Sequence, residues 1–191
     1  MRIKDELFFS PKHRFSELDF EDPSGIVEAF RDRVRGFYLD PASRLADSDA
    51  AFALGSLCCV TIDFLAKYSL GVDKATKQTF VRWLSRIAPQ FQERDPRNDK
   101  QPLAMRFYND FRCGLVHQGR VLNLGQFSFE PKEVVISDQT GIIVNPRLLL
   151  DGIDNAFEGY VINLESNSSA RGRLIKQLRK DFDQELEMFH T

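Results

Sequence analysis

The segment from Asp47 to Leu70 constrains the fold most, because a helix formed here carries apolar side chains on almost every side. Its apolar residues are Phe52, Leu54, Leu57, Cys58, Val60, Ile62, Phe64 and Leu65. A helix with so little polar surface has to be covered by other elements or by a second chain. Gly71 follows as a predicted C-cap. We therefore expect this helix at the centre of a bundle or in a subunit interface.

Five further segments repeat apolar residues at intervals of three and four, which is typical of amphipathic helices. They are approximately residues 23–40, 74–88, 102–119, 146–164 and 170–189. Asp22-Pro23 and Asn145-Pro146 each supply an N-cap followed by a first-turn proline. Asp40-Pro41 is expected to end the first of these helices. Residues 92–101 are expected to form a polar loop.

The periodicity changes after Gly119. Short β-type segments occur at 127–129, 134–136 and 142–144, and Asp138–Gly141 is a predicted turn. This pattern predicts a β-hairpin insertion over residues 126–145. The whole sequence therefore predicts a single domain, residues 1–191, that is mostly α: an up-and-down helical bundle with a small β-hairpin insertion.

Composition limits the classes of function. The formal net charge of −2 gives no global attraction to nucleic acid or to anionic membranes, so a polyanion needs a local binding site. The three cysteines and three histidines show no zinc-site spacing, and no metal or cofactor is expected. The N-terminal residues are charged, and Asp63 and Lys67 interrupt the longest apolar run. We expect a cytoplasmic protein with no membrane partner.

The helix predicted over 102–119 carries the residues best suited to chemistry. At 100° per residue, four polar residues fall on one stripe opposite the apolar row. They are Arg106, Asp110, Cys113 and His117. Arg112 lies about 140° around the axis and about 7.5 Å along it from His117. The two diverge on one helix, but two such helices crossing at a two-fold axis would bring both pairs into one cleft.

This combination suits a phosphate ester. Histidine is readily poised as a general acid or base near neutral pH, and arginine is a fixed positive fork for phosphoryl oxygens. Asp110 could orient the ring of His117 or raise its pKa.

The segment from Phe107 to Arg120 resembles the signature helix of the HEPN superfamily, in which an Arg is followed after four to six residues by a His on one helix of a bundle. The resemblance implies a metal-independent endoribonuclease that works as a homodimer, in a toxin or phage-defence setting and with a cognate antitoxin as a possible partner. It makes Arg112 and His117 the catalytic pair. His117 would assist attack of a ribose 2′-hydroxyl or protonate the leaving oxygen, and Arg112 would hold the scissile phosphate. The candidate supporting residues are Asp110, Arg106, Asp63 and Arg120.

Two alternatives stay open. Active members of the superfamily usually carry Asn, Asp or His directly after the Arg, and this sequence has Cys113. That departure favours a non-catalytic HEPN module that binds a nucleotide or a partner protein. A dimeric scaffold, in which Arg112 and His117 only stabilise the interface, is the other alternative.

Each candidate residue also has a structural interpretation. Arg112 would form an ion pair with a neighbouring helix or across a dimer interface. His117 would sit at a helix C-terminus, where a cation is favoured. Arg106 and Asp110 would form an i, i+4 surface pair. Asp63, mid-helix among apolar residues, would pair with an Arg or Lys, or belong to the same cleft. The basic start of the last helix is expected to be a solvated face.

Overall fold

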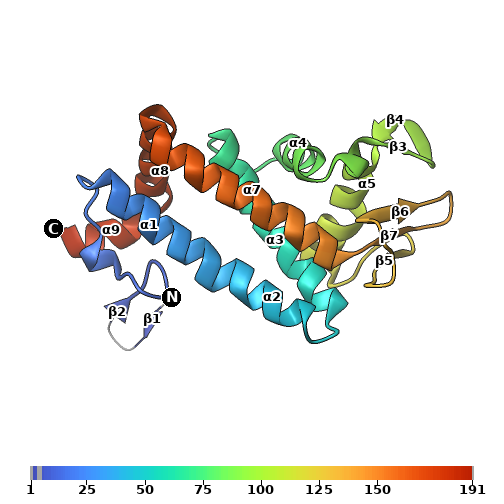
Figure 1. Cartoon of the computed structure of the whole chain (residues 1–191), viewed down its shortest axis with the longest axis horizontal. Coiled ribbons are helices and arrows are strands. Elements are labelled where there is room, and N and C mark those ends of the chain that lie inside the picture. Colours follow the sequence, from blue (N-terminus) through green and yellow to red (C-terminus); the bar gives the residue numbers. More distant parts are fainter. Residues whose placement is uncertain (1, 4–5, 191) are drawn as a thin grey trace. The chain divides into compact units, whose positions relative to one another are not determined.

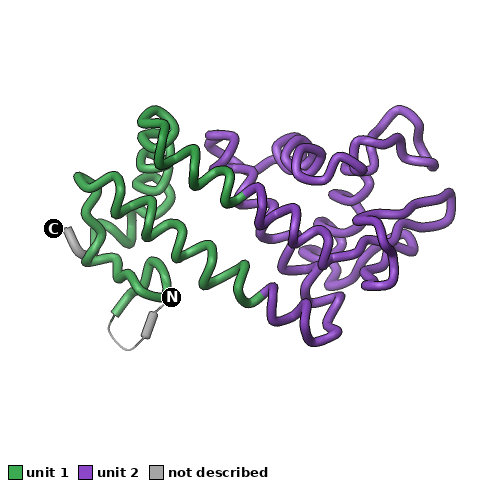
Figure 2. Tube along the Cα trace, in the orientation of Figure 1, with its two compact units in different colours: residues 1–41, 157–191 green, residues 42–156 purple. Residues whose placement is uncertain are grey.

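The computed structural model describes residues 2–3 and 6–190, and it is mostly helical, as the sequence predicts (Figure 1). The chain forms two compact units (Figure 2). Unit 1 comprises Met1–Pro41 and Phe157–Thr191, and unit 2 comprises Ala42–Ala156. Side chains of residues 2, 3, 189 and 190 are not described. The Phe189 side chain on the last predicted helix, and residues 1, 4 and 5 of the charged N-terminus, therefore lie outside what the structure describes.

Unit 2 contains the helices that carry the candidate site. They are α2 (Asp40–Ala46, beginning in unit 1), α3 (Ala51–Leu70), α4 (Lys77–Ile87), the 3₁₀ turn η3 (Pro89–Gln92), α5 (Leu103–Phe107), the π-helical turn η4 (Tyr108–Cys113) and α6 (Gly114–Gln118). Gly71 ends α3 with a φ of 64°, as predicted for a glycine C-cap. Helix α3 begins at Ala51 rather than near Asp47, because Asp49 adopts a left-handed conformation with a φ of 55°.

Stacked aromatic rings form the core of unit 2 around Phe107. Its ring centroid lies 4.7 Å from that of Phe111 and 5.2 Å from that of Phe91. All three side chains are buried. Aromatic pairs at these separations add to the free energy gained by burying the rings. Phe107 and Phe111 therefore fix one face of the helix formed by α5, η4 and α6, here called the motif helix, against the core.

A three-stranded sheet follows the motif helix. It consists of β5 (Gly125–Phe127), β6 (Val135–Ser137) and β7 (Ile142–Val144) in the order β5-β7-β6. Strands β6 and β7 form the antiparallel hairpin, while β5 pairs with β7 in parallel. A Cβ on Gly55 would lie 2.4 Å from the Phe127 ring, so α3 and β5 approach closely. The predicted insertion therefore contains a hairpin and a third strand.

A second hairpin stands where we expected a polar loop. It joins β3 (Arg94–Asp95) to β4 (Asn98–Pro102). Arg97 in its turn donates hydrogen bonds to the carbonyl oxygens of Gln139, Thr140 and Asn123. The loop prediction is wrong because these contacts with distant segments, which local composition does not reveal, hold the turn in place.

Unit 1 combines an N-terminal segment with helices from both ends of the chain. Its elements are β1 (Arg2–Ile3), β2 (Glu6–Leu7), the 3₁₀ turn η1 (Phe15–Glu17), α1 (Pro23–Val34), the π-helical turn η2 (Arg35–Leu39), the second part of α7 (Pro146–Ser166), α8 (Ser168–Asp181) and α9 (Asp183–His190). The Asp22 side chain caps α1 by accepting from the amides of Ser24 and Gly25. Asn167 caps α8 in the same way.

Two predictions for helices in this region are wrong: one concerns where a helix ends, and the other concerns whether a helix is continuous. Asp40-Pro41 does not end the first helix, which continues through η2 and α2 to Ala46. Pro41 lacks an N–H group, but the π-helical turn directly before it already replaces the regular hydrogen-bond pattern. The last predicted helix is interrupted at Phe182, whose ring packs 5.5 Å from Phe9 and below the Arg33 guanidinium. Tertiary packing of the Phe182 ring accounts for the second position.

Among the described residues, α3 alone has the length and hydropathy of a membrane span. Of its most apolar 18-residue window, 44% is buried inside the protein. Core helices of folded proteins meet the same criteria, so the length and composition of α3 do not distinguish a membrane span from a core helix.

Candidate functional site

The motif helix is not a uniform α-helix. It runs through α5, η4 and α6 and ends at Gly119, which has a φ of 66°. A π-helical turn has wider i→i+5 hydrogen bonding, so residues on either side of it do not keep a constant angular step. Arg106 and Asp110 are buried, each 5% exposed, while His117 is exposed. The predicted polar stripe from Arg106 to His117 is therefore wrong.

Arg106 and Asp110 belong to a buried polar network. Arg106 Nη1 donates to Asp95 Oδ1 at 3.2 Å and to the carbonyl oxygen of Asp138 at 3.1 Å. Arg106 Nε lies 3.5 Å from Asp110 Oδ2, and Asn123 Nδ2 donates to Asp110 Oδ1 at 2.8 Å. The expected i, i+4 pair exists, but it lies in the interior rather than on the surface. These two residues hold the motif helix against the β3–β4 and β6–β7 turns.

Arg112 pairs with Asp63 of α3, as its structural interpretation predicts. Arg112 Nη2 and Nε lie 2.6 Å and 3.2 Å from the same oxygen, Asp63 Oδ2. Burial alone would lower the pKa of Arg112, but the hydrogen bonds and charge of Asp63 outweigh it and raise that pKa. Arg112 Cζ also lies 5.6 Å from the centroid of the Tyr108 ring. The guanidinium is therefore charged and fixed in place, and three of its five N–H bonds are not used by Asp63.

Asp63 and Arg112 line a groove of about 450 Å³ between α3 and the motif helix. The remaining lining residues are Phe52, Ser56, Cys59, Val60, Leu115, Val116 and Gly119. Phe52, Val60 and Val116 are 53%, 50% and 57% exposed. Three half-exposed apolar side chains around one ion pair form an exposed apolar patch of the kind that another protein can cover.

The other two candidate residues lie outside this groove. His117 is exposed at the end of the motif helix and has no hydrogen bond or ion pair with the described residues. Arg120 is exposed, and its Nη2 donates to Gln118 Oε1 at 3.3 Å. Of the pockets described for residues 2–3 and 6–190, none is lined by both His117 and Arg112.

Two neighbouring side chains, Cys59 and Tyr108, have raised pKa values and stay uncharged at neutral pH. Burial, followed by the nearby Cys58 thiol, raises the pKa of Cys59 well above its usual range. Burial and the Cys113 thiol also raise the pKa of Tyr108, against the opposing effect of Arg112. The groove can therefore offer a fixed guanidinium beside Asp63, flanked by uncharged side chains.

Sequence reasoning did not assign Phe52, Val60 or Ser56 to the site. The usable signal was the nearly all-apolar helix over 47–70, which predicts either a bundle centre or an interface. Because Val60 and Phe52 stay half-exposed, one side of α3 remains uncovered within the chain.

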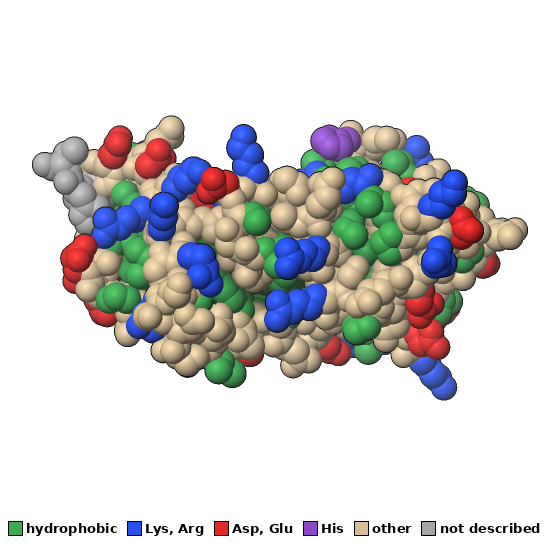
Figure 3. All heavy atoms as spheres, turned by 90° about the horizontal axis from the view of Figure 1, so that it is seen from above, with side chains coloured by type: hydrophobic (Ala, Val, Ile, Leu, Met, Phe, Trp, Pro, Cys, Tyr) green, Lys and Arg blue, Asp and Glu red, His purple; other side chains and the backbone are tan. Residues whose placement is uncertain are grey.

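Comparisons with family models, curated proteins and solved structures give no match for this chain. Within residues 2–3 and 6–190, no group of three or more His, Cys, Asp or Glu side chains is arranged to hold a metal ion. On the face shown in Figure 3, Lys and Arg side chains lie in small groups among acidic and uncharged ones. The fold and site thus define a mostly α-helical protein with an Arg-containing apolar groove and an exposed histidine on one helix.

Proposed function

We propose that this protein is a HEPN-like up-and-down bundle that acts, as a homodimer, as a metal-independent endoribonuclease or RNA-binding protein of the toxin or defence type. The observation that carries the proposal is the placement of Arg112 in a half-exposed apolar groove, five residues before an exposed His117 on the same helix. A second copy seated along this groove would cover Phe52, Val60 and Val116. It would also bring a second Arg112–His117 pair to the same cleft.

The environment of Arg112 supports a phosphate-binding role. Asp63 holds the Nε edge of the guanidinium through one oxygen, so N–H groups remain for a phosphoryl oxygen. A carboxylate that fixes an arginine reduces the side-chain entropy lost when substrate binds. Asp63 is therefore a positioning residue in this proposal.

The reaction follows from these groups. One imidazole of His117 accepts the proton of a ribose 2′-hydroxyl, whose oxygen then attacks the adjacent phosphorus. Arg112 stabilises the negative charge that grows on the phosphoryl oxygens. The 5′-oxygen leaves with a proton from the second copy's imidazolium, giving a 2′,3′-cyclic phosphate and a 5′-hydroxyl.

The test is RNA cleavage in excess chelator, with identification of the product ends. Wild-type protein should cut and leave cyclic phosphates, and His117→Ala should lower the rate by roughly 100-fold or more, the usual contribution of a general acid or base. Arg82→Ala is the matched control, because it removes an exposed positive charge from α4, outside both the motif helix and the groove. Cutting that survives in His117→Ala would contradict the proposal, as would cutting that stops without divalent metal.

A second candidate is a non-catalytic HEPN-like module that binds a nucleotide or a partner protein, such as a cognate antitoxin. Two observations favour it: the negative charge of Asp63 balances the positive charge of Arg112, and Cys113 follows the Arg. Such a module should raise its melting temperature with a nucleotide and cut no RNA.

A further inference from the structure

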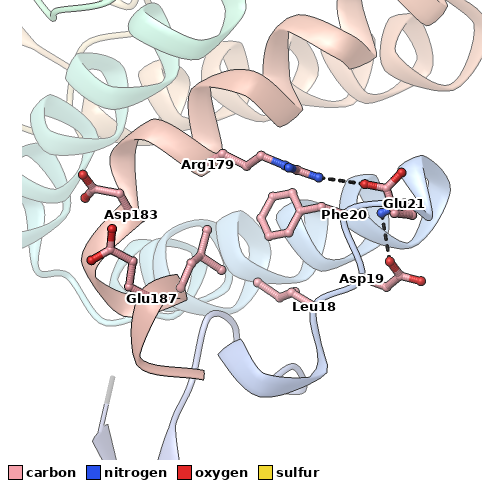
Figure 4. A pocket seen from close by; sticks show the side chains of 8 residues that line it. Leu18, Asp19, Phe20, Glu21, Arg179, Asp183 and Glu187 are labelled. Atoms are coloured by element: carbon pink, nitrogen blue, oxygen red, sulfur yellow. Dashed lines mark hydrogen bonds and ion pairs between the residues drawn. The ribbon is translucent and has the colours of Figure 1, made fainter. Parts of the chain in front are cut away.

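A pocket that does not involve the motif helix lies in unit 1 and has a volume of about 470 Å³ (Figure 4). The segment before α1 and the helices α8 and α9 line it. Leu18, Phe20 and Leu186 contribute apolar surface; Leu18 is buried and the other two are half-buried. A volume of this size accommodates one or two large apolar side chains.

Carboxylates surround the apolar part. Asp19 and Glu21 lie at one end of the pocket in Figure 4, and Asp183 and Glu187 lie at the other. All four residues are exposed, so their charges face solvent at the pocket mouth. An apolar centre with a charged rim is the usual composition of a protein–protein interface.

The pocket already holds one guanidinium of its own chain. Arg179 Cζ lies 4.9 Å from the centroid of the Phe20 ring, and Arg179 Nη2 donates to Glu21 Oε1 at 3.1 Å (Figure 4). This arrangement shows that the ring and rim together accept a planar cation. Arg179 engages Glu21, whereas the side chains of Asp19 and Asp183 have no cationic partner among the described residues.

We propose that this pocket is a docking site for a basic amphipathic segment of a partner protein. The partner's leucine-type side chains would contact Leu18, Phe20 and Leu186, and its Arg or Lys side chains would pair with Asp19 and Asp183. Nucleic acid and anionic lipid are excluded by charge, since four carboxylates and one guanidinium line the site. Acidic side chains outnumber basic ones in this pocket, whereas the Arg112 groove has one of each. The docking proposal does not depend on the proposed RNA activity.

The experiment uses the full-length protein and a labelled helical peptide, titrated by fluorescence anisotropy. The peptide carries leucines on one face, spaced three and four apart, and arginines on the other. The test variant is Asp19→Asn/Asp183→Asn. In the wild-type protein the Asp19 and Asp183 carboxylates accept hydrogen bonds from the backbone N–H groups of Glu21 and Gln184. The asparagine side-chain oxygens in the variant can accept the same hydrogen bonds. The matched control is Asp99→Asn/Glu130→Gln, which removes the same charge from exposed positions outside the pocket.

Wild-type protein and the control should bind the basic peptide alike, and the test variant should bind it about tenfold more weakly, as expected for two exposed ion pairs. A peptide with serines in place of the leucines should bind more weakly than the original, and one with glutamates in place of the arginines should not bind. Three results would overturn the proposal: no binding of the basic peptide to wild type, an equal loss in the control variant, or equal binding of the serine peptide.

Discussion

At the residue scale, Arg106 is the buried cation on which two carboxylates depend. Asp95 and Asp110 are 6% and 5% exposed, and both face this guanidinium. Replacing Arg106 with methionine keeps much of the side-chain volume but leaves two buried carboxylates without their counter-charge. We expect the free energy of unfolding to fall by about 3–5 kcal/mol, measured by urea denaturation.

Asn123→Ala provides the control for Arg106→Met. Asn123 also donates a hydrogen bond to Asp110, but Asn123 is exposed. Removing the Asn123 side chain therefore removes one hydrogen bond at the edge of the network. We expect a loss of about 1 kcal/mol. An Arg106→Met protein as stable as Asn123→Ala would mean that the buried carboxylates do not depend on Arg106.

Individual residues differ in how far the sequence revealed them. An ion pair of Asp63 with an Arg or Lys was predictable, since a charge in the middle of an apolar helix needs a partner if it is buried. That this partner is Arg112 required the structure. The burial of Arg106 was not predictable from a helical wheel. Arg106 is buried because Asp95 and the Asp138 carbonyl, which lie in other segments, pack against it, and a wheel drawn from the helix alone does not include them. The π-helical turn from Tyr108 changes only the angular positions of the residues after it.

At the element scale, Gly114 lets the loop after the motif helix fold back onto it. A Cβ at this position would lie 2.5 Å from the Arg120 carbonyl oxygen and 2.9 Å from Leu122 Cγ. The Leu122 amide in this loop also donates to the Asp110 carbonyl oxygen at 2.8 Å. Gly114→Ala should push the loop away and lower the free energy of unfolding by about 1–3 kcal/mol.

Gly159→Ala in α7 is the matched control for Gly114→Ala. A Cβ there meets nothing within 4 Å, so alanine should stabilise the helix by about 0.4–1 kcal/mol. Thermal unfolding of both variants measures the difference. Equal changes in the two proteins would show that the loop does not pack as described.

The β6–β7 turn should make stability depend on pH in acid. Hydrogen bonds from the Thr140 hydroxyl, then from the Gly141 and Thr140 amides, lower the pKa of Asp138 to about 2 from 3.8. A lowered folded-state pKa stabilises the protein above the unfolded-state value, and this contribution disappears as pH falls from about 4 to about 2. Asp138→Asn should therefore show a shallower loss of stability over this range.

Nuclear magnetic resonance titration of the Asp138 carboxyl measures its pKa directly. Thr140→Val removes the hydroxyl that lowers this pKa most, so the value should rise toward 3.8 in that variant. An unchanged titration in Thr140→Val would show that the hydroxyl does not bind the carboxylate.

Helix ends divide into those set by local sequence and those set by packing. Asp22 and Gly71 act as caps in the structure, and each was recognisable because a cap depends on one residue and its immediate neighbours. The break at Phe182 depends on Phe9, which is far away in the sequence. The parallel pairing of β5 with β7 was unpredictable for the same reason, since register between separated strands is not a local property.

At the scale of the whole molecule, the uncovered side of α3 is the feature that the proposed function depends on. Val60 on α3 and Val116 on the motif helix are both about half-exposed and line the same groove as Arg112. If a second copy covers this groove, a charge introduced at Val60 would be buried in the interface without a partner. Val60→Glu should therefore weaken dimerisation at least tenfold while leaving the monomer folded, because Val60 already faces solvent in one chain.

Analytical ultracentrifugation over a range of concentrations measures the dimer, and circular dichroism verifies the fold. Ile162→Glu is the matched control, since Ile162 is 63% exposed on α7 and does not line the groove. RNA cleavage should fall with the dimer fraction in Val60→Glu and stay unchanged in Ile162→Glu, because the active site we propose combines Arg112 and His117 from two copies. A wild-type protein that stays monomeric at all concentrations would contradict the composite site, as would a Val60→Glu monomer that cuts RNA at the full rate.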